Sequence, residues 1–214
     1  MKDKVVVVTG AAKGLGKSLA LECERRGARV IGCDIDSVDI TKREQIEDLL
    51  TNTVAKEGRV DYWINNAGVW HSDVRFDDLS ENLMRKMFEV NAFGTVNGMQ
   101  VALKQMRLQG FGTIVNIVST AALHGRPLHS AYAASKYALK GFTDSVREEL
   151  RGTNIRLVGV YPGGIKTGLF EGSKPAEYDY FMEPDDVAKK IVDNLESAVP
   201  EETQILLRPG QDLK

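Results

Sequence analysis

The chain has 214 residues, enough for one sizeable core, and its 28 basic and 30 acidic residues leave a net charge of -2. Because neither positive nor negative charge dominates, we do not expect nucleic acid or an anionic membrane as a partner. We expect a small-molecule substrate instead. Cys23 and Cys33 are the only cysteines, which excludes a disulfide framework. The N-terminus resembles neither a signal peptide nor a membrane span, so we expect a reduced, cytoplasmic protein.

Short apolar runs alternate with helical patterns along the chain. The runs are rich in Val and Ile, which is typical of parallel strands covered on both faces, and they span 4–9, 29–34, 60–65, 112–118, 154–161 and 203–207. The helical patterns span 15–26, 42–56, 80–108, 130–151 and 185–197. This order predicts an α/β fold, a doubly wound parallel sheet of Rossmann type with helices on both faces and ligands at the carboxyl ends of the strands.

No linker or internal repeat divides the chain, so we expect a single domain over 1–214. The one long irregular stretch is rich in Gly and Pro. A segment of this length in a compact domain is usually functional, and we expect a lid around 163–183.

The stretch 5–20 is compatible with two phosphate-binding devices. Residues 11–18 match a loose P-loop that ends in Gly16-Lys17-Ser18, which would hold a nucleoside triphosphate and magnesium. That interpretation requires an acid at the end of a strand to hold the metal. Asp61 follows only Val60 in its strand, so it is a poor candidate.

In the second interpretation, Gly10, Gly14 and Gly16 form the turn between a buried strand and a helix whose positive end faces a pyrophosphate. This device requires an acid about 20 residues further on to bind the adenosine ribose. Asp34, at the end of the second strand pattern, meets that requirement. A merely tight structural connection is the alternative for the glycines taken alone.

A second group of residues lies within 116–142. Ser119 comes just after a strand pattern, and Tyr132 and Lys136 are four residues apart, so they share one helix face. Lowering a tyrosine pKa from about 10 to about 7 takes about 4 kcal/mol. An ammonium about 4 to 6 Å away supplies about 3 to 4 kcal/mol at an effective dielectric constant of about 20. Taken alone, Tyr132 and Lys136 fit an ordinary amphipathic pair better; together with Ser119 and the glycine turn they favour a catalytic pair.

Together these motifs resemble the short-chain dehydrogenase/reductase family, single-domain branch, over nearly the whole chain. The resemblance rests on five segments: Thr9-Gly10-x-x-x-Gly14-x-Gly16, Asn65-Asn66-Ala67-Gly68, Asn91 in "VNAFG", Ser119 with Tyr132-x-x-x-Lys136, and "YPGGIKTGL". It implies an NAD(P)-dependent oxidoreductase that transfers hydride between nicotinamide and a small carbonyl or alcohol. The implied catalytic residues are Asn91, Ser119, Tyr132 and Lys136. The implied cofactor-binding residues are Gly10, Lys13, Gly14, Leu15, Gly16, Asp34, Asp39, Ile40, Asn66, Ala67, Gly68, Tyr132, Lys136, Pro162, Gly163, Ile165 and Thr167.

The resemblance also implies a role for each catalytic residue. Tyr132 is the general acid in reduction and the base in oxidation, and Ser119 hydrogen-bonds the same substrate oxygen. Lys136 lowers the pKa of Tyr132 and holds the nicotinamide ribose, while Asn91 holds a water that links Lys136 to solvent. A non-catalytic dinucleotide sensor, the main alternative, would lack the tyrosine pair that this chain retains.

Two residues point to different cofactors. Asp34 favours NAD, because a carboxylate accepts hydrogen bonds from both ribose hydroxyls and repels a 2′-phosphate. Lys13 matches a basic residue found in NADP-binding relatives, so NADP remains possible. We expect NAD.

The chain departs from the family pattern between 34 and 60, where there is room for only one helix, beginning after Thr41 with Glu44 in the capping-box position. We therefore expect the third strand to be short or missing, so that the sheet ends near 29–34. The long helices at 80–108 and 130–151 resemble the surfaces through which relatives assemble, so a homodimer or homotetramer is expected. The three histidines are expected on the surface or in substrate loops, and no metal site is expected.

Overall fold

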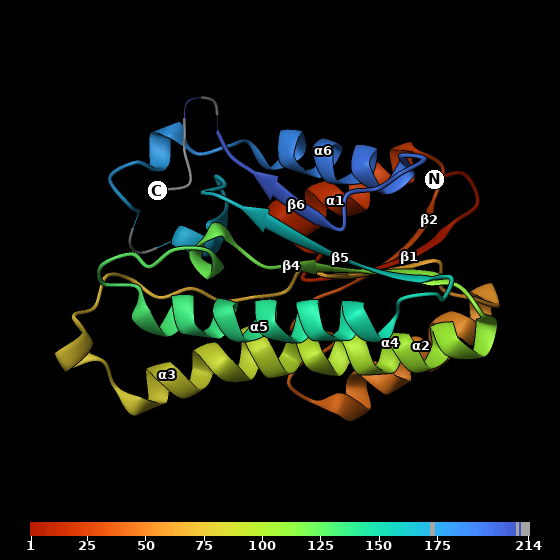
Figure 1. Cartoon of the computed structure of the whole chain (residues 1–214), viewed down its shortest axis with the longest axis horizontal. Helices are drawn as coiled ribbons and strands as arrows, with labels where there is room; N and C mark the ends of the chain where they lie inside the picture. Colours follow the sequence, from red (N-terminus) through yellow and green to blue (C-terminus); the bar gives the residue numbers. More distant parts are fainter. Residues whose placement is uncertain (172–173, 209, 211–214) are drawn as a thin grey trace.

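The computed structural model describes residues 1–171, 174–208 and 210, and within them the chain forms one six-stranded parallel sheet in the order β2-β1-β3-β4-β5-β6 (Figure 1). The strands are β1 (Val5–Thr9), β2 (Arg29–Cys33), β3 (Tyr62–Asn65), β4 (Gly112–Ile117), β5 (Ile155–Pro162) and β6 (Thr203–Leu206). The predicted fold class is therefore confirmed. The strand order reverses between β1 and β3, which is where such sheets bind ligands.

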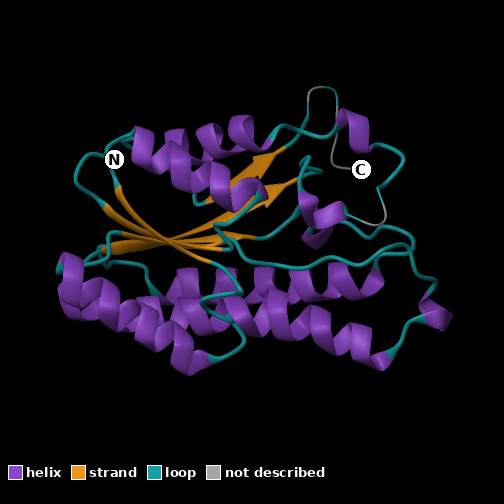
Figure 2. Cartoon of the chain, turned by 180° about the vertical axis from the view of Figure 1, so that it is seen from behind, coloured by secondary structure: helices purple, strands orange, loops and turns teal. Residues whose placement is uncertain are grey.

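Helices cover both faces of the sheet, as Figures 1 and 2 show. One face carries α1 (Gly14–Arg25) and α6 (Pro184–Glu196), and the other carries α2 (Arg43–Glu57), α4 (Thr95–Gln109) and α5 (Ser130–Glu149). Successive residues of β1 alternate between the two cores: Val6 and Val8 pack with α1 and α6, and Val7 packs with the opposite layer. The buried valine run in the sequence thus reflects a strand covered on both sides.

The sheet ends at β2, because only α2 lies between β2 and β3. The strand that the family pattern places between Asp34 and Val60 is absent, as expected, and the strand labelled β3 corresponds to the family's fourth strand. The predicted N-cap of α2 is wrong, however: the helix begins at Arg43, and its cap Lys42 makes no side-chain capping bond. The Thr41 hydroxyl donates instead to Asp39 (2.8 Å), and this local turn takes the side chain away from the helix end.

The predicted helix over 80–108 is not uniform. It consists of α3 (Glu81–Phe88), a π-helical turn (Glu89–Gly94) and α4. A single 3.6-residue period in the sequence conceals such a turn, because hydrophobic spacing changes little over six residues. The π-turn lies beside the carboxyl end of β3 and carries Asn91, which is completely buried.

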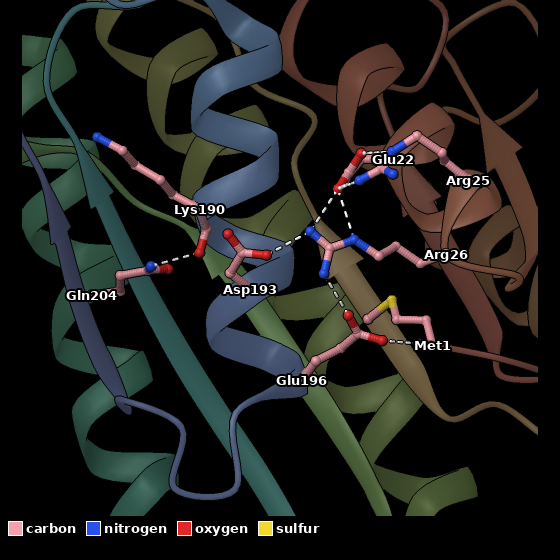
Figure 3. Close-up of polar contacts among 8 residues, drawn as sticks. All are labelled: Met1, Glu22, Arg25, Arg26, Lys190, Asp193, Glu196 and Gln204. Atoms are coloured by element: carbon pink, nitrogen blue, oxygen red, sulfur yellow. Dashed lines mark hydrogen bonds and ion pairs between the residues drawn. The ribbon is translucent and has the colours of Figure 1, made fainter.

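Polar side chains join the end of α1 to α6 (Figure 3). Arg26 donates to Glu22 (2.9 Å) on its own helix and to Glu196 (2.7 Å) on α6, and the N-terminal ammonium also contacts Glu196. Hydrogen bonding from Arg25 lowers the pKa of Glu22 to about 2, so this cluster is charged at neutral pH. Gln204 of β6 donates to the Lys190 carbonyl (3.0 Å), which ties α6 to the edge of the sheet.

The predicted lid is partly ordered into turns. A bridge between Ile165 and Met182 closes its base, and two three-residue 3-10 helices, Gly168–Phe170 and Tyr178–Tyr180, lie beyond it. Residues 172–173 of this segment lie outside the described residues. Among the described helices, none is both long and apolar enough to cross a membrane.

Candidate active site

A cavity of about 1110 Å³ opens at the carboxyl ends of β1, β3, β4 and β5. All the residues predicted for the site line it, although they come from segments far apart in the sequence. The structure therefore brings the glycine turn, the serine and the tyrosine–lysine pair to one place. Their individual roles stay predictions.

The glycine turn leaves no space for side chains. Gly10 and Gly14 have φ values of +68° and +56°, in the left-handed region that favours glycine. A Cβ on Gly16 would lie 2.0 Å from the Gly10 oxygen and 2.4 Å from Nδ2 of Asn66. The segment after β3 is held against this turn, because Asn66 Nδ2 donates to the Thr9 carbonyl (2.9 Å).

The start of α1 fits a bound anion. Lys13 gives the helix no side-chain cap, and the first turn carries no acidic residue. The backbone N–H groups and the positive end of the helix dipole therefore face the cavity without a competing carboxylate from this turn. These features fit the pyrophosphate of a dinucleotide, with Gly14, Leu15 and Gly16 nearest to it.

We expect Gly16→Ala to weaken dinucleotide binding at least about tenfold, which is about 1.4 kcal/mol, because its methyl group forces the turn apart. Dinucleotide affinity measured by calorimetry checks this. Gly125→Ala is the matched control, since a Cβ there meets nothing within 4 Å. Equal affinities for the parent and Gly16→Ala would contradict the prediction.

Asp34 lies on the far side of the turn, with its carboxylate held by the backbone. Its oxygens accept hydrogen bonds from the Ala12 amide (3.0 Å) and the Ile35 amide (2.8 Å). Ile40 continues this wall of the cavity and packs close to Gly94, where a Cβ would lie 2.7 Å from Ile40 Cδ1. A ribose hydroxyl beside Asp34 would thus meet a fixed carboxylate.

Ser119, Tyr132 and Lys136 occupy the opposite end of the cavity. Ser119 follows β4 and its hydroxyl accepts from the Ala121 amide (3.1 Å), which fixes the side chain at the strand end. One turn of α5 separates Tyr132 from Lys136, and Lys136 Nζ lies 5.9 Å from the centre of the Tyr132 ring. The ammonium also donates to the Ile117 carbonyl (3.0 Å).

The electrostatics of this pair differ from the sequence expectation. Burial raises the pKa of Tyr132 above its ordinary value, and hydrogen bonding with Ser119 opposes this only in part. Burial lowers the pKa of Lys136 from 10.5 to about 8. The loss of water around the two buried groups outweighs the attraction between their charged forms, on which the sequence expectation rested.

Asn91 does not reach into the cavity with a free amide. Its Oδ1 accepts from the Val69 amide (2.8 Å), and its Nδ2 donates to the Val69 carbonyl (2.9 Å) and to Ser135 (3.1 Å). Gly68 passes close by, where a Cβ would lie 3.1 Å from Asn91 Oδ1 and 3.8 Å from Lys136 Nζ. The side chain thus clamps the loop after β3 against α5.

Several residues that line the cavity were not among the predicted catalytic and cofactor-binding residues. Trp70, His129 and Phe170 form an aromatic wall, in which the Phe170 ring lies 5.1 Å from that of Trp70 and the His129 ring 5.6 Å. Charged residues from α3, the loop before α5 and the C-terminal segment also line the cavity, namely Lys86, Arg126 and Arg208. No local motif marks them, because their proximity depends on how the lid and the loops fold together.

The histidines divide into three environments. His71 is buried rather than on the surface, His129 pairs with Asp73 (2.9 Å), and His124 does not line the cavity. No group of three or more His, Cys, Asp or Glu side chains that could hold a metal occurs in the described ranges.

The P-loop alternative finds no support in this geometry. Lys17 is exposed on α1, directed to solvent rather than into the cavity lining. Asp61 lies just before β3, at the amino ends of the strands and so opposite the glycine turn, where it pairs with Lys4 (3.0 Å) and Arg59 (2.8 Å). Neither side chain is placed to hold a magnesium nucleotide at the glycine turn.

Comparison with known proteins agrees with this geometry. The family model described as short chain dehydrogenase matches residues 35–177. A short-chain dehydrogenase/reductase from Penicillium canescens, olcF, is 32% identical over 217 residues, covering 94% of this chain and 83% of its own.

Two solved structures have the same fold. ElxO with NADP bound is 28% identical, with a TM-score of 0.84 and coverage of 97% of both chains. A 3-ketoacyl-(acyl-carrier-protein) reductase from Brucella melitensis, complexed with NADH, has a TM-score of 0.88 at 24% identity and covers 96% of both chains. The chain therefore belongs to the short-chain dehydrogenase/reductase family and is an NAD(P)-dependent oxidoreductase.

Proposed function

We propose that the protein transfers hydride between nicotinamide and a small carbonyl or alcohol, with Tyr132 as general acid and base. The observation that carries this is the grouping of Tyr132, Ser119 and Lys136 in one cavity with the glycine turn. When bound, the nicotinamide supplies or accepts the hydride. The chain itself supplies the proton and the hydrogen bonds at the substrate oxygen.

In this proposal each side chain acts at a defined atom. The Tyr132 hydroxyl gives a proton to the substrate oxygen during reduction and takes it back during oxidation. Ser119 donates a hydrogen bond to the same oxygen and so stabilises the negative charge that develops there. Lys136 lies within reach of the tyrosine ring and favours its ionised form, and a cationic nicotinamide adds to this effect.

The aromatic wall limits the substrate. Trp70, His129 and Phe170 enclose the space next to Tyr132, and Phe181 packs on Phe170 (5.3 Å) from the lid. This lining supports a substrate whose carbonyl carries an apolar group, because burying apolar surface against these rings is favourable. A screen of carbonyls and alcohols followed by nicotinamide absorbance, with both cofactors, tests the proposal. If the protein binds the dinucleotide but shows no turnover that Tyr132→Phe abolishes, the result would favour the non-catalytic sensor instead.

We propose NAD as the preferred cofactor, since the fixed carboxylate of Asp34 repels a 2′-phosphate. Asp34→Asn removes the charge with little change in shape. We expect its preference for NAD over NADP, measured as the ratio of kcat/KM values, to fall at least about tenfold. Asp36→Asn, an exposed acid that does not line the cavity, serves as the control. A preference of the parent protein for NADP of tenfold or more, which is about 1.4 kcal/mol, would overturn the assignment to NAD. Lys13 is the residue that favours NADP.

We further propose that the chain acts as a single domain in a homo-oligomer built on the outer surface of α4 and α5. Tyr137 and Phe142 of α5 and Leu108 of α4 are exposed, which supports an apolar contact with a second copy. The two free, buried cysteines support a reducing, cytoplasmic setting. The mass of the protein in solution decides the oligomeric state.

A further inference from the structure

His71 lies behind the cavity wall and contacts the backbone of the helix that carries Tyr132. It is 5% exposed and does not line the cavity. Its Nε2 accepts a hydrogen bond from the backbone N–H of Tyr132 (3.3 Å), and its Nδ1 lies 2.6 Å from the Ser72 carbonyl. The side chain therefore connects the loop after β3 to the start of α5.

The position of this contact on α5 matters. The helix begins at Ser130, and its N-cap His129 makes no side-chain capping bond. The first backbone amide of α5 that makes the helical hydrogen bond to a carbonyl four residues earlier is that of Ala133, which donates to the carbonyl of the N-cap His129 (2.9 Å). The Tyr132 amide is thus one of the donors that a helix leaves unsatisfied at its start, and a side chain from 61 residues away supplies the acceptor.

The partners of His71 define its protonation. The Ser72 carbonyl only accepts, so Nδ1 carries the proton. The Tyr132 amide only donates, so Nε2 has none. The geometry fits the tautomer with its proton on Nδ1 and the lone pair of Nε2 directed at the Tyr132 amide.

The other side of the Tyr132 backbone is also fixed. The Ser135 hydroxyl donates to the Tyr132 carbonyl (2.7 Å) and accepts from Asn91 (3.1 Å). Asn91 in turn holds both backbone groups of Val69, two residues before His71. The amide and the carbonyl of Tyr132 are therefore both anchored to one network that includes the loop after β3.

We propose that His71 is a positioning residue, which accepts the Tyr132 amide and so holds the phenol of Tyr132 at the reactive end of the cavity. This inference rests on the proposed role of Tyr132. His71 does not line the cavity, but its ring also packs on those of Trp70 (6.2 Å) and His129 (6.3 Å), so the test must separate the contact with the Tyr132 amide from packing against the aromatic wall. His71 comes from the loop whose residues Asn66, Ala67 and Gly68 line the cavity where the proposed cofactor would bind.

Three substitutions separate positioning from packing. A glutamine amide reaches about as far as Nε2, so His71→Gln keeps an acceptor for the Tyr132 amide. An asparagine amide reaches only as far as Nδ1, so His71→Asn loses it, and His71→Leu has no polar group. We expect kcat to fall about 100-fold in His71→Leu and His71→Asn, with KM for the dinucleotide unchanged and with His71→Gln restoring most of the activity. His124→Leu, a histidine outside the cavity lining, is the control.

Hydrogen exchange at the Tyr132 amide tests the contact without any turnover. Exchange should be faster in His71→Asn than in the parent and slow again in His71→Gln, and this pair decides the matter even if His71→Leu does not fold. A kcat within about threefold of the parent in His71→Asn, equal losses in the asparagine and glutamine variants, or unchanged exchange would each overturn the proposal. Full activity in Tyr132→Phe would overturn the proposed function as well, whereas an inactive Tyr132→Phe beside a fully active His71→Asn would overturn only the role of His71.

Discussion

Tyr132→Phe is expected to lower kcat by about 10² to 10⁴-fold while leaving dinucleotide affinity nearly unchanged. The substitution removes one hydroxyl and keeps the ring, so the packing of α5 against the loop after β3 should persist. Only the proton donor at the substrate oxygen disappears. Steady-state nicotinamide absorbance measures kcat, and fluorescence titration measures dinucleotide affinity.

The same helix offers a matched control for this experiment. Tyr137 is 45% exposed and lies outside the cavity lining, so Tyr137→Phe removes a phenolic hydroxyl without touching the site. We expect the control to retain the activity of the parent. Turnover of Tyr132→Phe within about tenfold of the parent would contradict the assigned role of the phenol, since general acid catalysis contributes more than that.

Lys136→Met is expected to abolish activity and, at neutral pH, to stabilise the fold. Burial lowers the pKa of Lys136 from 10.5 to about 8, so the charged lysine costs the folded state about 3 kcal/mol relative to an unburied one. Methionine fills a similar volume without a charge. The lost hydrogen bond to the Ile117 carbonyl offsets part of this gain.

The sign of the effect sets its pH dependence. Below about pH 8 the parent carries the full cost of the buried charge, and between about pH 8 and pH 10.5 it gains stability as the folded state releases its proton. The methionine variant has no such transition. The difference in unfolding free energy between variant and parent should therefore be largest at pH 7 and shrink toward pH 10. Urea unfolding of both proteins at several pH values measures it, and a difference that stays constant with pH would show that the ammonium is not destabilised by burial.

The sequence allowed the sheet and the cofactor turn to be predicted because their determinants are local. The valines of β1, the spacing of Gly10, Gly14 and Gly16, and the acid at the end of β2 lie in short segments whose geometry follows from strand and helix periods. The missing strand could be inferred from chain length alone, because 27 residues separate Asp34 from Tyr62 and the structure places only α2 between them.

Other features depend on contacts that no local pattern encodes. His71 was expected on the surface or in a substrate loop, yet the packing of that loop on α5 buries it. The pKa of Tyr132 was expected to fall, yet desolvation by surrounding segments raises it. The lining residues Lys86 and Arg208 come from α3 and the C-terminal segment, and only the tertiary structure brings both to one cavity.

The π-helical turn at Glu89–Gly94 makes the connection from α3 to α4 sensitive to length. Such a turn contains one residue more than an α-helical turn would, and this wider spacing sets the direction of the side chains within it. Deleting a single residue there would return the segment to α-helical spacing and change the direction in which the side chains of the turn itself, Asn91 among them, project. A deletion in this turn would therefore separate Asn91 from Val69 and release the loop that it holds.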